Sequence, residues 1–162
     1  MVNLGMQSQQ IINTEIIHDT MTSVMYRLLH KSFAAGVIDK AVQLGLLAFS
    51  YHLFIQWQDI KLPYQYFPKT YQDCIQSLRV ADSVSPRLML WLLTIGSISL
   101  FDISNETWLR EYMREYIHRC QVKTWKEMQD ILECFMWIAL LDEHLGKQIY
   151  DELFLGIDEE KF

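Results

Sequence analysis

Two Glu-x-x-His pairs are the first pattern in this sequence that could do chemistry, Glu15 with His18 and Glu115 with His118. Helical bundles use two such pairs to hold a pair of iron ions, because positions three apart on a helix point to one side. On the helix predicted over residues 104–121, however, Glu115 and His118 lie about 115° and 175° from the centre of the apolar stripe, at roughly 100° per residue. Both therefore face water, and no metal site and no cofactor is predicted.

His52 is the second candidate for chemistry. It stands between Tyr51 and Leu53 in a segment, residues 37–57, that is apolar on nearly every helical face. Burial of the ring is therefore expected. A buried histidine is either a core residue with one hydrogen-bond partner or a group that moves protons in catalysis. His52 is the first candidate for a general acid or base if the protein is an enzyme.

Asp142, Glu143 and His144 follow one another directly after an apolar run. A carboxylate beside a histidine can tune the pKa of the ring for acid–base work. Neighbouring residues on a helix point in different directions, so the alternative is a solvated helix end. Asp142 and His144 join His52 as catalytic candidates for an enzyme only.

Aromatic side chains offer a different chemistry, the binding of a small apolar ligand. Tryptophan and tyrosine line ligand pockets because they combine flat apolar area with a polar tip, although they also fill ordinary cores. The candidates for a pocket wall are Tyr51, Trp57, Trp91 and Trp137. The sequence contains no glycine-rich phosphate loop, nucleophile elbow or aspartate-rich diphosphate motif. These absences argue against nucleotide-dependent enzymes and the usual terpene cyclases.

The composition fits one folded domain that does not bind nucleic acid directly. The chain has 162 residues, of which 51% are hydrophobic, and only 6 glycines and 3 prolines interrupt it. This length suits a single domain with a substantial core. The net charge of −6 disfavours direct contact with nucleic acid, whose phosphates require clustered lysine and arginine.

The cysteines and the first residues favour an intracellular protein. Cys74, Cys120 and Cys134 cannot all pair within one chain, and no two have metal-ligand spacing. Free thiols are typical of intracellular proteins. The N-terminal MVNLGMQSQQ lacks the basic start and apolar run of a signal peptide. Lysine and arginine never cluster, so the sequence favours neither the nucleus nor the cytoplasm.

The most hydrophobic stretch, residues 85–101, is predicted to be a buried helix and not a membrane span. Its apolar part, residues 88–101, is short and includes a threonine and two serines, whereas a span needs about 20 mostly apolar residues. Ser85 can cap the helix, and Pro86 suits the first helical position because its missing N–H costs nothing there. The helix is expected to end near Asp102.

The rest of the periodicity predicts an all-α fold, a single bundle of about six or seven helices over residues 1–162. Apolar residues recur at helical spacing, and no segment alternates with period two for long enough to form a strand. Further helices are expected over residues 10–33, 37–57, 69–82 and 104–121, with a loop over residues 58–68.

The last part of the chain carries its own start and stop signals. Thr124 and Glu127 form a capping box, in which each side chain accepts from the other residue's backbone N–H. The helix that follows is expected to turn Phe135 and Met136 inward. Gly146 is expected to separate it from a last helix that ends near Phe154.

Three segments form a series, PRLMLWLLTIGSISL, TWLREYMREYIHRC and KTWKEMQDILECFMWIALLDEHLGKQIYDELF. The series resembles the C-terminal part of the fungal-specific transcription factor domain of zinc-cluster regulators. There, an arginine precedes a helix with a tryptophan and a glycine, and two tryptophan-bearing helices and a final helix with an aspartate and a glycine follow. The matching residues are Arg87, Trp91, Gly96, Trp108, Trp125, Trp137, Asp142, Gly146 and Tyr150.

The resemblance covers residues 86–154 and implies regulation, interaction or effector sensing, with no catalytic residue to carry over. The regulators of this family also have an N-terminal six-cysteine zinc cluster that binds DNA. With 3 cysteines, this sequence cannot form that cluster. DNA binding by this chain is therefore not expected.

Two functional hypotheses follow. In the first, the chain is a stand-alone helical regulatory or interaction module that binds a protein partner, a second copy of itself or a small apolar ligand. In the second, the scaffold has become an enzyme of fungal secondary metabolism, a cyclase or isomerase with an aromatic-lined pocket and His52 as its acid or base. A third possibility is that every tryptophan simply fills the core. These alternatives differ in whether Trp91 borders a cavity.

Overall fold

The computed structural model describes residues 16, 19–20, 22–28, 30, 36–58 and 66–155, apart from the side chains of residues 37, 54–58, 140, 141 and 155. The fold is all-α, with seven helices and no strand among these residues, as predicted. The described residues between 16 and 30 are helical. The other helices are α2 (Val37–Gln58), α3 (Phe67–Ala81), α4 (Pro86–Ser99), α5 (Thr107–Arg119), α6 (Trp125–Leu132) and α7 (Ala139–Leu155).

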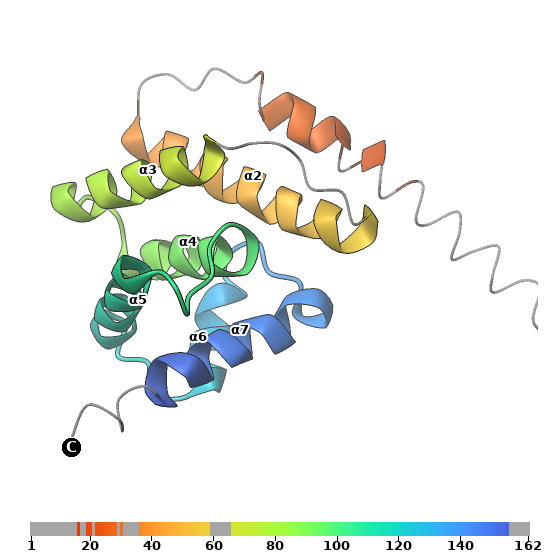
Figure 1. Ribbon diagram of the computed structural model, residues 1–162. Helices are drawn as coiled ribbons and strands as arrows, with labels where there is room; N and C mark the ends of the chain where they lie inside the picture. Colours follow the sequence, from red (N-terminus) through yellow and green to blue (C-terminus); the bar gives the residue numbers. More distant parts are fainter. Residues whose placement is uncertain are drawn as a thin grey trace, which may run out of the picture.

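Helix α4 is the centre of the fold. Figure 1 shows α2 and α3 on one side of α4, and α5, α6 and α7 on the other. Nine consecutive residues of α4, from Met89 to Ser97, are buried. A helix buried on every face must be apolar all round, which explains why this stretch is the most hydrophobic in the chain. No helix among the described residues is both long and apolar enough to cross a membrane.

The start signals predicted for α4 and α6 are confirmed. The Ser85 hydroxyl accepts the N–H of Leu88, and a proline lies in the first turn of α4. Thr124 and Glu127 form the complete capping box, with Thr124 Oγ1 accepting the Glu127 N–H at 3.3 Å and Glu127 Oε2 accepting the Thr124 N–H at 3.1 Å. These start signals can be recognised in the sequence because each joins residues only three positions apart.

The predicted boundary of α3 is wrong by two residues. The helix begins at Phe67 and not at residue 69, so Pro68 lies in its first turn. Proline is tolerated there because the first backbone N–H groups of a helix have no partner within it. Phe67 is half-buried against the core, which favours the earlier start.

The predicted division between the last two helices is also wrong. Helix α6 ends at Leu132, a turn follows, and α7 begins at Ala139 and runs through Gly146. The sequence predicts that Met136 points inward, but its side chain is 48% exposed. Gly146 ends no helix and instead lies buried between two tryptophans. An added Cβ there would come within 2.8 Å of the rings of Trp125 and Trp137.

Candidate functional site

The structure joins two of the three catalytic candidates, His52 of α2 and Asp142 of α7. Nε2 of His52 lies 3.1 Å from Oδ1 of Asp142, although the residues are 90 positions apart in the sequence. The two side chains are 5% and 0% exposed. The pair is therefore a buried polar link between two helices that are far apart along the chain.

Asp142 also fixes the start of α7. Its Oδ2 accepts the backbone N–H of Ile138 at 2.9 Å, and its own N–H donates to the Ile138 carbonyl at 2.8 Å. A carboxylate in the first turn of a helix is favoured by the free N–H groups and by the helix dipole. One buried carboxylate thus satisfies both the helix start and His52.

A carboxylate bound to an imidazole resembles the part of a catalytic dyad that fixes the orientation of the ring. Because Nε2 faces Asp142, any proton exchange with a substrate would fall to Nδ1. The ring is almost fully buried, however, and substrate would have to enter the core to reach it. The geometry therefore favours a structural link over a working acid or base.

The third catalytic candidate, His144, lies apart from this pair. It is exposed, and with Lys147, Gln148, Asp151 and Glu152 it borders an open hollow of about 300 Å³ along α7. Glu143 is exposed as well. The three consecutive polar residues therefore divide between the core and the surface, because neighbours on a helix point in different directions.

Trp91, a predicted pocket residue, is packed against protein groups. It is 2% exposed, its ring stacks on Phe135 with centroids 5.7 Å apart, and its indole N–H donates to the Met136 carbonyl at 2.9 Å. On α2, Gly45 lies so close that an added Cβ would meet the indole ring at 2.7 Å. Trp91 thus joins α2, α4 and the turn before α7.

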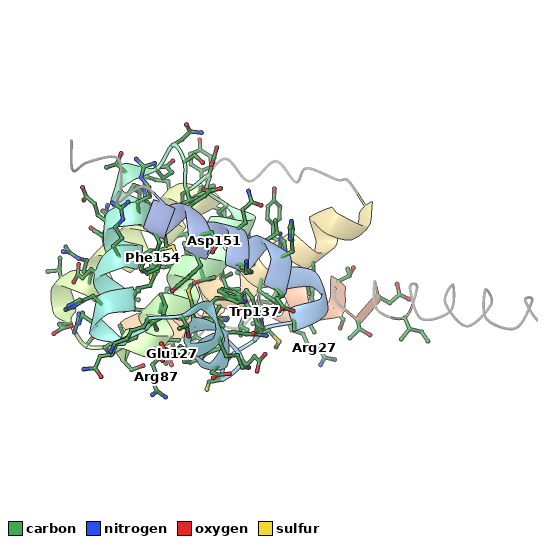
Figure 2. The ribbon with its side chains drawn as sticks, turned by 90° about the horizontal axis from the view of Figure 1, so that it is seen from below. Arg27, Arg87, Glu127, Trp137, Asp151 and Phe154 are labelled. Atoms are coloured by element: carbon green, nitrogen blue, oxygen red, sulfur yellow. The ribbon has the colours of Figure 1, made fainter. Side chains whose placement is uncertain are left out.

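The other predicted pocket residues differ in position. Trp137 is half-buried in an aromatic group with Trp125 at 6.5 Å, and Figure 2 shows it towards the beginning of α7. The buried indole N–H groups of these two tryptophans have no hydrogen-bond partner in the described part of the chain. Tyr51 is half-buried. The Trp57 side chain lies outside the described residues.

Comparisons with known protein families, curated proteins and solved structures gave no significant match. Eight of the nine residues that carry the resemblance to the fungal domain are buried or half-buried in this fold, and Arg87 is exposed. Trp125, Trp137 and Gly146 pack together, and Asp142 caps α7. Apart from Arg87, the matching residues of the series thus pack in the interior or cap a helix.

The Glu-x-x-His pairs do not form a metal site in the described part of the chain. No group of three or more histidine, cysteine, aspartate or glutamate residues there could hold a metal ion. Glu115 instead pairs with Arg79 at 2.9 Å and approaches Arg119 at 3.9 Å, and His118 is exposed. Glu15 and His18 lie outside the described residues.

The three cysteines are free. Burial raises the pKa of the Cys74 and Cys120 thiols and outweighs the opposing effect of the nearby cations, Lys40 for Cys74 and Arg87 and Arg119 for Cys120. A raised pKa keeps a thiol protonated, whereas the thiolate is the nucleophile. These two cysteines are therefore poor nucleophiles.

An open cleft that sequence reasoning missed lies between the end of α4 and α7. Its volume is about 180 Å³. The apolar lining consists of Ile98, Phe101, Ile103, Leu145 and Ile149, and the polar lining consists of Ser97, Asp102, Gln148 and Glu152. The only local signals were the polar spacing of Gln148 and Glu152 on α7 and the Asp-x-Ser-Asn turn after α4. Neither reveals that the two segments face each other.

Proposed function

We propose that this chain is a helical regulatory or interaction module that binds a small effector or a protein partner and does not contact DNA directly. The observation that carries the proposal is the contrast between its two polar sites. The His52–Asp142 pair is closed off from solvent, whereas the cleft between α4 and α7 is open and lined by apolar and polar groups. Binding needs an accessible site, which the cleft provides and the buried pair does not.

Two further features support the proposal. The resemblance of residues 86–154 to the fungal transcription factor domain favours a regulatory role, because that domain is associated with regulation and effector sensing. The acidic net charge of −6 argues against direct contact with nucleic acid. The proposal includes an intracellular location, which the three free thiols favour.

Native mass spectrometry of the purified full chain tests the proposal. We expect a co-purified small molecule, a stable dimer or a captured protein partner. Leu145→Trp should reduce binding of a small molecule, because the larger ring fills the cleft, while Glu143→Trp on an exposed position of the same helix should not. A strictly monomeric chain with neither ligand nor partner would overturn the proposal.

The His52–Asp142 contact favours a second candidate, an enzyme of the cyclase or isomerase type with His52 as acid or base. Asp142 would hold the imidazole in one orientation, as carboxylates do in known dyads. This candidate requires the ring to become accessible during turnover. It ranks second because both side chains are buried.

Incubation of the protein with a fungal metabolite extract, followed by mass spectrometry of the products, tests the second candidate. An enzyme should form a product that His52→Gln does not form, while His144→Gln serves as the exposed control. Circular dichroism would check that both variants fold. Full turnover by His52→Gln would remove His52 as the acid or base.

A further inference from the structure

The cleft between α4 and α7 has an apolar lining and an acidic rim. Ile103 and Ile149 are buried, and Ile98, Phe101 and Leu145 are half-buried along the walls. The half-exposed apolar walls leave hydrocarbon surface in contact with water. A ligand that covers this surface gains hydrophobic free energy.

Charge selects the kind of ligand. Asp102 and Glu152 are the charged residues among the nine that line the cleft, and no lysine, arginine or histidine is among those nine. Of the nearby cations, Arg110 donates to the carbonyls of Ile103 and Ser104. Lys147, which lines the adjoining hollow with Glu152, pairs with Asp151 at 3.3 Å. An anion in the cleft would meet two like charges, whereas a cation would meet two opposite ones.

Glu152 has capacity left for a donor. It accepts from Ser104 Oγ at 3.4 Å and from Gln148 Nε2 at 3.3 Å, both near the upper limit of hydrogen-bond length. Asp102, by contrast, accepts from the Ser104 N–H at 3.0 Å and from Asn105 at 2.6 Å. Asp102 is thus committed to its own turn, and Glu152 is the better partner for an ammonium group.

The volume of the cleft limits the size of the ligand. The volume of about 180 Å³ lies below the roughly 300 Å³ at which pockets for drug-sized ligands begin. The ligand therefore has few heavy atoms. It needs a cationic head with several N–H donors and a short hydrocarbon chain.

We propose that this cleft binds a small free alkylammonium ion, with the ammonium group on Glu152 and the chain on Ile98 and Ile149. The inference rests on the proposed function, since the amine would be the effector or part of it. A lysine side chain of a partner protein offers the same chemistry, and the experiment below distinguishes it from a free amine.

The test is a titration of the full chain with n-butylammonium chloride, in which NMR measures the amide chemical shifts at each concentration. Saturable shifts are expected at residues 101–104 and 148–152. Butyrate and butanol, which match the chain length without the positive charge, should bind at least tenfold more weakly. Glu152→Gln should weaken n-butylammonium binding at least tenfold, while Glu143→Gln, the same change on an exposed position of α7, should stay within twofold.

Each other outcome overturns the inference. Equal affinity for butanol and n-butylammonium, or an unchanged affinity of Glu152→Gln for n-butylammonium, would show that charge has no role. Tighter binding of Nα-acetyl-lysine N-methylamide than of n-butylammonium would assign the cleft to a partner's lysine. If no shift occurs in the cleft but native mass spectrometry finds another ligand or partner, this inference fails and the proposed function stands. If both experiments are negative, both fail.

Discussion

Asp142 shows how a single residue can connect two distant parts of the fold. Its carboxylate accepts from the start of α7 and binds His52 of α2, with no exposure to solvent. A buried carboxylate is costly unless it is fully hydrogen-bonded, and here both oxygens have a partner. The same residue is the aspartate of the series that resembles the fungal domain, so its place in that series has a structural explanation.

Removal of this carboxylate should destabilise the protein strongly. Asp142→Ala removes the acceptor of the Ile138 N–H and leaves the buried His52 ring without its partner, and we expect a loss of about 3 kcal/mol in the free energy of unfolding. Glu143→Ala, on the next and exposed position, should change it by less than about 0.5 kcal/mol. Urea denaturation followed by circular dichroism measures both. Similar losses for the two variants would contradict the buried link.

Gly146 is a second residue whose role depends on packing. An added Cβ would lie 2.7 Å from the Trp137 ring and 2.8 Å from the Trp125 ring. Alanine favours a helix over glycine by about 1 kcal/mol, but crowding in a packed core costs about 1–3 kcal/mol. We expect Gly146→Ala to lower the melting temperature. Gly36→Ala is the matched control, because its added Cβ meets only the flexible side chain of Asp39; a rise in melting temperature for Gly146→Ala would contradict the close packing.

Individual helices differ in how well their sequence defines them. The starts of α4 and α6 followed directly from Ser85 and from the Thr124–Glu127 box. The turn between α6 and α7 did not, because the run of residues 135–141 is apolar enough to continue a helix. The chain turns there since Trp91 binds the Met136 carbonyl and Asp142 caps the Ile138 N–H. Those partners come from other elements or from the new helix itself.

The capping box gives a prediction at this scale. Thr124→Ala removes the acceptor for the Glu127 N–H at the start of α6, and we expect a loss of about 1 kcal/mol in the free energy of unfolding. Thr107→Ala at the start of α5 is the control, because its hydroxyl accepts only a long bond of 3.4 Å from Arg110. Urea denaturation compares the two. Equal losses would indicate that the box contributes nothing beyond a general effect of threonine removal.

The whole molecule is organised around α4. Titratable groups whose pKa is changed by burial act together on how its stability depends on pH. Tyr71 of α3 is buried and donates to the Leu92 carbonyl of α4 at 2.6 Å. Burial raises the pKa of Tyr71 far above its ordinary value, and it also raises the pKa of Tyr116, Tyr150, Cys74 and Cys120. All these groups therefore keep their protons in the folded state at a pH where the unfolded chain releases them.

Stability should consequently fall at alkaline pH. Above about pH 9 the unfolded state binds fewer protons than the folded state, so the free energy of unfolding decreases as pH rises. Tyr71→Phe should lower the free energy of unfolding by about 1 kcal/mol at pH 7, because the hydrogen bond to the Leu92 carbonyl is lost. Its free energy of unfolding should then fall less steeply than that of the wild type as pH rises. Tyr66→Phe, on an exposed tyrosine, should follow the wild-type curve. Parallel alkaline declines for wild type and Tyr71→Phe would contradict the burial of the hydroxyl.

The sequence alone predicts the all-α class, the caps of α4 and α6, the burial of His52 and a buried helix within residues 85–101, of which residues 89–97 are buried. These follow from interactions within a few residues or from the hydrophobicity of one segment, so they can be read locally. That residues 1–162 form a single domain stays a prediction. Three contacts emerge only once the helices are packed: Asp142 is the partner of His52, Trp91 packs against Gly45 and Phe135, and Glu152 and Asp102 line the same cleft. Those contacts join segments 44 to 90 residues apart, and their geometry depends on how the helices pack around α4.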